Sequence, residues 1–132
     1  MTNYIACETI SVSISLPAEE VYDFAHDLGN FPKWVSYCTS IKKEETGWVM
    51  ETPYSLSSIQ VTKKNPYLIL DHVTSPDPGV EIIDAMRVIP NGAGCTVLLT
   101  GYQLPGMSDE KFSEAILTGK KDLEALKTVL EN

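Results

Sequence analysis

Apolar and polar residues alternate strictly over the segment from Ile10 to Leu16. Such a period of two puts every second side chain on the same face, which is typical of a strand with one buried face. One parity holds Ile10, Val12, Ile14 and Leu16, and the other holds Ser11, Ser13 and Ser15. The pattern therefore predicts a half-buried first strand.

Helical spacing replaces the alternation after Pro17, a residue that suits the first turn of a helix. Glu19 and Glu20 follow it, where their charges complement the positive end of the helix. The apolar residues Val21, Phe24, Ala25 and Leu28 then fall on one helical face. We expect a short helix that ends near Gly29, and a second short helix that begins at residues 30–32.

Short β-branched and aromatic segments, separated by turn signals, occupy residues 38–104. They predict six further strands near 38–45, 47–52, 54–64, 67–74, 80–89 and 95–104. Connections this short join antiparallel strands, because a parallel crossover needs about a dozen residues or more. We therefore expect a seven-stranded antiparallel meander.

A long helix is predicted at the C-terminal end of the sequence. Ser108 is a good N-cap, and Asp109 and Glu110 lie in the first turn. One apolar stripe then runs along the helix through Phe112, Ile116, Gly119, Leu123, Leu126 and Leu130. A helix with a single apolar stripe packs on one face of a sheet, so the predicted class is α+β.

Length and charge narrow the class of protein. The 132 residues fit one domain, residues 1–132, and 43% of them are hydrophobic, which is ordinary for a globular protein. The net charge of −8 has the wrong sign for binding nucleic acid or an anionic membrane surface. No apolar run approaches the ~18 residues that span a bilayer, and residues 1–32 contain no Lys or Arg for a signal peptide. We expect a soluble, cytoplasmic protein with no nucleic-acid partner and no membrane insertion.

Metal-binding patterns are absent from the sequence. Cys7, Cys38 and Cys95 are far apart and form no C-x-x-C pair, and His26 and His72 are the only histidines. We therefore predict reduced cysteines, no metal site and no cofactor.

The order of elements resembles the START-like, or SRPBCC, superfamily. The segments Leu16–Tyr22, Phe31–Trp34 and Leu123–Glu131 carry this resemblance, which is strongest to small members of the polyketide cyclase/dehydrase type and the heat-shock-ATPase-activator type. The resemblance implies a helix-grip fold, in which a curved antiparallel sheet wraps the long helix and leaves a cavity between them. Its members bind lipids, polyketides or other hydrophobic ligands, and some are enzymes. Many relatives carry Gly-Trp in the last helix, where this chain has Gly119-Lys120.

The predicted cavity face depends on how the hairpins pair. If Thr74 opposes Val80 and Ile89 opposes Cys95, the even-numbered residues of the last three strands share a face on which Asp84 alone is acidic. We assign that face to the cavity, because the other face carries charges along its length. Together with residues from the helices and the middle strands, the predicted ligand-binding set is Trp34, Leu56, Leu70, Ile82, Met86, Leu98, Thr100, Phe112, Ile116 and Gly119.

The same pairing makes His72 and Asp84 diagonal neighbours on adjacent strands. A carboxylate that orients an imidazole creates a general base, and Tyr102 on the same face could donate to a developing oxyanion. His72, Asp84 and Tyr102 are therefore the candidate catalytic residues. The alternative is a buried His–Asp pair that satisfies only itself.

Three functions follow from this interpretation. The first is binding of a small hydrophobic or amphipathic molecule in the cavity. The second is a cyclase or dehydratase that uses His72 with Asp84. The third is a protein-interaction module or homodimer, because the odd-numbered face would expose a large apolar patch made of Ile69, Val73, Ile83, Val97 and Leu99.

Overall fold

A computed structural model describes residues 3–132 of the chain. Within them, seven strands form one antiparallel sheet in the order β1-β7-β6-β5-β4-β3-β2. The elements along the chain are β1 (Cys7–Ile14), α1 (Ala18–His26), the 3-10 helix η1 (Leu28–Lys33), β2 (Ser40–Glu44), β3 (Gly47–Glu51), β4 (Leu56–Val61), β5 (His72–Ser75), β6 (Ile82–Asn91), β7 (Gly94–Tyr102) and α2 (Asp109–Glu131).

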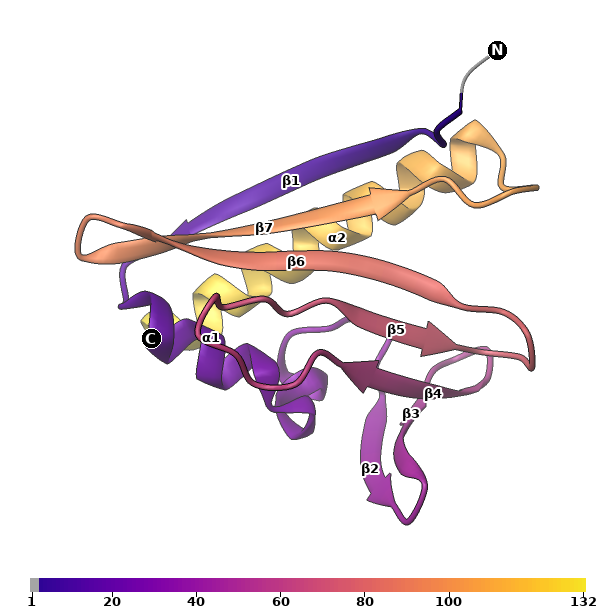
Figure 1. Cartoon of the computed structure of the whole chain (residues 1–132), viewed down its shortest axis with the longest axis horizontal. Coiled ribbons are helices and arrows are strands. Elements are labelled where there is room, and N and C mark those ends of the chain that lie inside the picture. Colours follow the sequence, from indigo (N-terminus) through magenta and orange to yellow (C-terminus); the bar gives the residue numbers. More distant parts are fainter. Residues whose placement is uncertain (1–2) are drawn as a thin grey trace.

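The curved sheet wraps α2, which contacts β1 and β7 and runs behind β7 and β6 in Figure 1. We call this side the inner face of the sheet. Leu123 and Leu126 of α2 are almost completely buried, as the apolar stripe predicts. Ser108 caps the helix by accepting a hydrogen bond from the Lys111 amide. The predicted helix-grip arrangement is therefore confirmed, with α1 and η1 closing one end of the sheet.

The path of the chain differs from the predicted seven-stranded meander. Strands β2 to β7 form a meander, but β1 pairs with β7 at the opposite edge from β2, with Ile14 opposite Cys95. Residues 15–39, which contain α1 and η1, carry the chain from one edge of the sheet to the other. The second predicted helix is thus the 3-10 helix η1, and it contains Pro32.

The strand predicted at 67–74 begins only at His72. Leu68 has a φ of 59°, a left-handed conformation that no strand residue adopts. The Asn65 side chain holds the preceding loop by accepting hydrogen bonds from the amides of Tyr67 and Ile69. Local side-chain bonds therefore interrupt the expected strand. Its pairing with β6 is reduced to an isolated bridge between Ile69 and Arg87, where the Leu70 amide donates to the Met86 carbonyl and the Val88 amide donates to the Leu68 carbonyl.

The β6–β7 hairpin corrects the predicted register by one residue. Pro90, not Ile89, lies opposite Cys95, and Asn91 pairs with Gly94 across a tight turn in which Gly92 has a φ of 60°. A slip of one residue exchanges the two faces of a strand. The inner face of β7 therefore holds Cys95, Val97 and Leu99, whereas Thr96, Leu98, Thr100 and Tyr102 lie on the outer face.

The β5–β6 register differs from the prediction by two residues, which leaves the faces unchanged. Thr74 pairs with Ile82, not Val80, and His72 lies directly opposite Asp84. The predicted diagonal pair is therefore a directly opposed pair on the inner face.

Candidate functional site

The His72–Asp84 pair lies on the inner face of two neighbouring central strands. His72 Nε2 is 3.4 Å from Asp84 Oδ2, and His72 Nδ1 is 3.2 Å from the carbonyl oxygen of Leu70. The imidazole side chain is 12% exposed, whereas the carboxylate of Asp84 is 33% exposed. Solvent therefore reaches the inner face at Asp84 but hardly reaches the ring behind it.

This environment favours the protonated imidazole. Burial on its own lowers the pKa of His72, but the hydrogen bond and charge of Asp84 and the Leu70 carbonyl outweigh it, so the pKa is raised above its ordinary value. Both ring nitrogens face acceptors, and an imidazole donates from both nitrogens only when it is protonated. His72 is thus suited to act as a hydrogen-bond donor or proton donor, which differs from the predicted general base.

A second carboxylate, Asp122 of α2, lies near enough to Asp84 to feel its charge. It is only 9% exposed, and its Oδ1 accepts a hydrogen bond of 3.1 Å from the Ser36 amide. Burial raises the pKa of Asp122 and the negative charge of Asp84 raises it further, while the Ser36 hydrogen bond lowers it; the net direction is upward. The charge of a carboxylate on the sheet therefore acts on a buried carboxylate of the helix that covers it.

Sequence reasoning missed Asp122, although the sequence contains a signal for it. Asp122 lies three residues after Gly119 and four before Leu126, both of which belong to the apolar stripe. Those spacings place it on the buried flank of the helix, where an unpaired carboxylate is unusual.

Aromatic side chains from η1 and its C-terminal end form a wall beside the histidine. The Phe31 ring packs edge-on against His72 at 5.7 Å between centroids and against Trp34 at 5.3 Å. Trp34 is 5% exposed, and its indole Nε1 has no hydrogen-bond acceptor among residues 3–132. A buried donor without an acceptor is rare in folded proteins and requires an explanation.

Six other residues of the predicted ligand-binding set lie in the core or on the inner side. Leu70, Met86 and Ile116 are buried in the core, and Ile82, Phe112 and Gly119 are partly exposed on the inner side. A Cβ on Gly119 would lie 3.0 Å from Ile10 Cδ1, so this glycine allows α2 to approach β1 closely.

Four predicted site residues lie outside this site. Leu98, Thr100 and Tyr102 face outward because of the register of β7, and the Thr100 hydroxyl bonds that of Thr9 at 2.7 Å on the outer face. Tyr102 therefore cannot donate to a ligand beside His72. Leu56 is 65% exposed, because the neighbouring Ser57 is the β4 residue that turns inward.

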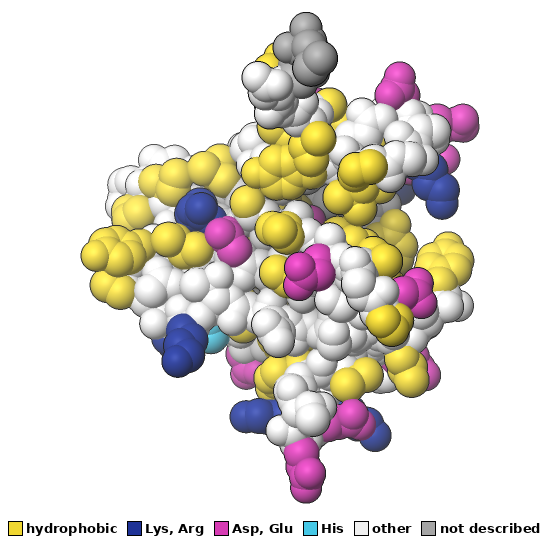
Figure 2. Space-filling view, turned by 45° about the vertical axis from the view of Figure 1, so that its right-hand side comes forward, with side chains coloured by type: hydrophobic (Ala, Val, Ile, Leu, Met, Phe, Trp, Pro, Cys, Tyr) yellow, Lys and Arg dark blue, Asp and Glu magenta, His cyan; other side chains and the backbone are white. Residues whose placement is uncertain are grey.

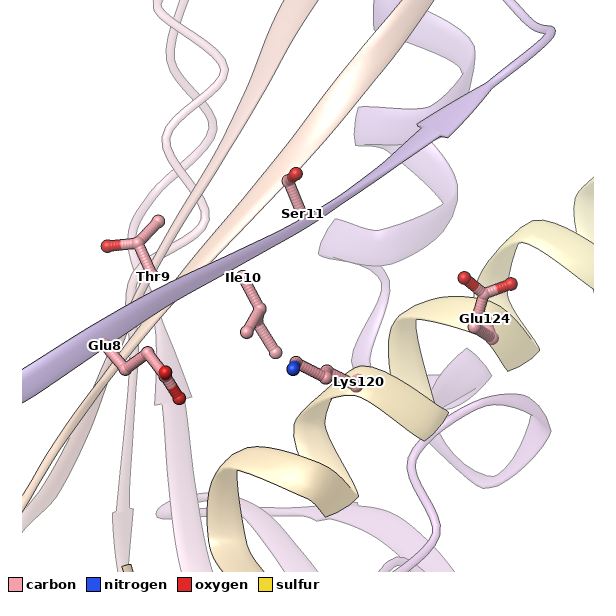
Figure 3. A pocket seen from close by; sticks show the side chains of 6 residues that line it. All are labelled: Glu8, Thr9, Ile10, Ser11, Lys120 and Glu124. Atoms are coloured by element: carbon pink, nitrogen blue, oxygen red, sulfur yellow. The ribbon is translucent and has the colours of Figure 1, made fainter. Parts of the chain in front are cut away.

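Two surface pockets lie away from His72, Asp84 and Asp122. One, of about 270 Å³, lies between β1 and α2 and is lined by Glu8, Thr9, Ile10, Ser11, Lys120 and Glu124. Figure 3 shows Ile10 and Glu8 on the side of β1 that faces the helix, with Thr9 and Ser11 on the other side. The other, of about 490 Å³, lies beside the 76–81 loop. Neither pocket is lined by a residue of the predicted ligand-binding set.

The outer face is less apolar than the homodimer hypothesis requires. Val97 and Leu99 belong to the core, so the predicted patch loses two of its members, while Ile83 is 51% exposed. Arg87 on this face forms an ion pair with Asp71. On the face shown in Figure 2, hydrophobic side chains form several groups interrupted by polar and acidic ones. An outer-face dimer stays a prediction that now depends on Ile83 and its neighbours.

Residues 3–132 contain no cluster of metal ligands and no helix that could span a membrane. Nowhere in that range do three or more His, Cys, Asp or Glu side chains gather closely enough to hold a metal ion. The three cysteines are unpaired thiols, and burial raises the pKa of Cys38 to about 11. Neither α1 nor α2 is long and apolar enough to cross a membrane.

Comparison with known proteins identifies the family. A family model described as "polyketide cyclase / dehydrase and lipid transport" matches residues 7–131. No curated protein sequence matches the chain significantly. Among solved structures, an uncharacterised protein from Bacillus thuringiensis is 18% identical, with a TM-score of 0.79 over 96% of this chain and 100% of the other.

Two further structures support the same fold. A START superfamily protein from Mycobacterium smegmatis is 12% identical, with a TM-score of 0.71 over 95% of this chain and 97% of the other. The Zhui aromatase/cyclase from Streptomyces sp. R1128 is also 12% identical, with a TM-score of 0.72 over 97% and 94%. At these identities the likeness concerns the fold, while the family model covers nearly the whole sequence. The chain therefore belongs to the polyketide cyclase/dehydrase and lipid transport family of the START-like superfamily.

Proposed function

We propose that the protein binds a small hydrophobic or amphipathic molecule between α2 and the inner face of β4–β6. The apolar part of the ligand would contact Ile82 and Phe112, and its polar group would meet His72, Asp84 and Asp122. The family description, which includes lipid transport, supports this class of ligand. The observation that carries the proposal is the partly exposed Asp84 on an inner face that is otherwise largely apolar.

Stability alone gives no reason to keep Asp122 inside the fold. Removing an ionisable group from water costs free energy unless partners compensate for the loss, and within the described chain Asp122 has only Ser36 as its hydrogen-bond partner. Ligand sites typically combine apolar walls with a few convergent polar groups. An imidazole, two carboxylates and an indole from four different elements fit that description.

Two neighbouring residues of β6 provide a matched test. Ile82 is on the inner face, and Ile83 is 51% exposed on the outer face. Ile82→Arg would fill and charge the proposed site, whereas Ile83→Arg would leave it open. With Nile red as a neutral fluorescent probe, we expect the wild type and Ile83→Arg to bind and Ile82→Arg to lose most binding. Circular dichroism checks that both variants fold, as we expect. Equal binding by the two variants would contradict the proposal.

A second candidate function is an acid–base reaction of the cyclase or dehydratase type. The observation that favours it is the pair of unlike groups: His72 is an imidazole whose raised pKa favours a proton it could donate, and Asp122 is a carboxylate with a raised pKa that could accept one. The test is turnover of poly-β-keto thioesters, with His72→Gln and Asp122→Asn as variants. This function predicts that both variants lose about 10²-fold or more in rate while Nile red binding is kept.

A further inference from the structure

We propose that the polar end of this site selects a neutral hydroxyl group, so that the ligand is an alcohol or phenol and not a fatty-acid-like anion. This inference rests on the proposed function and adds the chemical class of the ligand. It stands on two observations of different kinds: a buried donor that lacks an acceptor, and the sign of the charges around it.

The donor is the indole Nε1 of Trp34. It is sealed from solvent and has no acceptor in the part of the chain that the structure describes. Leaving such a group unpaired costs free energy that a ligand oxygen would recover. Trp34 packs on Phe31, whose ring also contacts His72, so the indole belongs to the same interior region as the polar groups.

The acceptor is the Asp122 carboxylate, whose hydrogen-bond partner in the described chain is Ser36, two residues after Trp34. A hydroxyl is the small group that both accepts a hydrogen bond from an N–H and donates one to a carboxylate. A carboxylate ligand has no hydrogen to donate to Asp122. An ammonium ligand has no lone pair to accept from Trp34.

The charges argue in the same direction. The side-chain charges that act on His72 are those of Asp84 and Asp71, and the charge that acts on Asp122 is that of Asp84. All of these are negative, and His72, whose pKa is raised, is already engaged by Asp84. An anionic ligand would therefore enter a region whose net charge repels it.

Binding requires a local adjustment of side chains. Trp34 Nε1 has no free space in contact with solvent, so a hydroxyl can reach it only if neighbouring side chains move aside. The unpaired donor destabilises the packing without a ligand. Less free energy is therefore needed to move the side chains aside.

Four ligands on one scaffold test the inference: naphthalene, 2-naphthol, 2-naphthoate and 2-naphthylmethylamine. Calorimetry at pH 7 measures their affinities, and ¹H–¹⁵N NMR follows the two indole N–H signals, from Trp34 and Trp48. We expect 2-naphthol to bind about tenfold tighter than naphthalene, because each hydrogen bond contributes a few-fold. We expect 2-naphthoate to bind more weakly than naphthalene, and the Trp34 signal to shift with 2-naphthol alone.

Two variants test separately the unpaired Trp34 donor and the negative charge of Asp122. Trp34→Phe should reduce the preference for 2-naphthol over naphthalene to less than about threefold, since the donor is lost while an aromatic ring remains. Asp122→Asn should improve 2-naphthoate binding, because a negative charge is replaced by an amide that can donate. Trp48→Phe is the control: it removes the other indole and should leave the preferences unchanged.

The outcomes distinguish this inference from the proposed function. If naphthalene binds but 2-naphthol binds no tighter, or if 2-naphthoate or the amine binds best, the inference is overturned and the binding function stands. If none of the four ligands binds and Nile red is not bound either, the binding function itself fails.

Discussion

The two ends of the curved sheet differ in what their inner faces hold. Around β1 and β7 the interior is apolar and closed: Val97 and Leu126 have no exposed surface, and Leu123 and Cys95 are 1% exposed. Around β5 and the start of β6 the interior holds a histidine, two carboxylates and an unpaired indole N–H. The first, which we call the closed end, supplies most of the apolar core, and the second, which we call the chemical end, holds the polar groups of the proposed site.

Adjacent residues of helix α2 contribute to the two ends of the sheet. Leu123 turns into the closed core, while Asp122, one residue earlier, meets the Ser36 amide beside η1. The C-terminal end of the helix is fixed to the closed end of the sheet, where Lys127 donates to the Ser13 carbonyl and Glu131 accepts from the Ser15 amide. The position of Asp122 is therefore set by the part of the helix that is most firmly packed.

The largest expected effect tests which face of β7 belongs to the closed end. Val97→Lys places an ammonium in a site with no exposed surface, which costs more than about 4 kcal/mol and should prevent folding. Leu98→Lys, one residue along on the outer face, should fold normally. Circular dichroism and denaturant titration compare the two. A folded Val97→Lys protein with an unfolded Leu98→Lys protein would mean that Leu98, and not Val97, faces the core.

A smaller loss should follow truncation of the closed core on α2. Leu126→Ala removes buried methyl groups and leaves a cavity, so we expect a loss of about 2–5 kcal/mol in the free energy of unfolding. Leu117→Ala on the same helix is the control, because Leu117 is 53% exposed and should cost less than about 0.5 kcal/mol. Similar losses at both positions would mean that the stripe is not the core-facing side.

The chemical end should make stability depend on pH through His72. Its pKa is higher in the folded protein than in the unfolded chain, so the stabilisation is complete below the ordinary histidine pKa and disappears as the pH rises through the raised folded value. His72→Gln should therefore lose most stability, relative to wild type, at pH 5–6 and least at pH 9. Urea titrations across that range measure the difference. A gap that widens with pH would contradict the protonated imidazole.

The smallest expected effect is a gain in the free energy of unfolding, on substitution of Asp122. The pKa of Asp122 is raised by burial, so the folded state disfavours its ionised form, and its contribution falls as the pH rises through the raised value. Asp122→Asn should therefore be at least as stable as wild type at pH 7, and its advantage should shrink toward pH 4. A clear loss of stability at pH 7 would mean that the carboxylate is mainly structural.

Local patterns in the sequence predicted the elements well and the faces less well. The alternation around Val12 and the stripe through Leu123 are properties of single segments, so periodicity identifies them. The β6–β7 register depends on one tight turn at Gly92, and an error of one residue there placed Thr100 and Tyr102 on the wrong face. His72 and Asp84 kept their face because the error at the β5–β6 loop was two residues.

The remaining parts of the site could not be read from one segment at a time. Asp122 meets Ser36, which is 86 residues away in sequence, and the unpaired state of Trp34 Nε1 depends on every side chain that surrounds it. Both are properties of the packed layers and not of a local motif.

The most direct test of ligand binding at the inner face is a ¹H–¹⁵N chemical-shift titration of the wild-type protein with naphthalene and then 2-naphthol. Binding at the chemical end predicts saturable shifts at the amides of His72, Ile82, Asp84 and Asp122, while the amides of Val97 and Leu126 in the closed core change little. Shifts confined to outer-face residues such as Ile83 and Leu98, or no saturable shift with either compound, would contradict it.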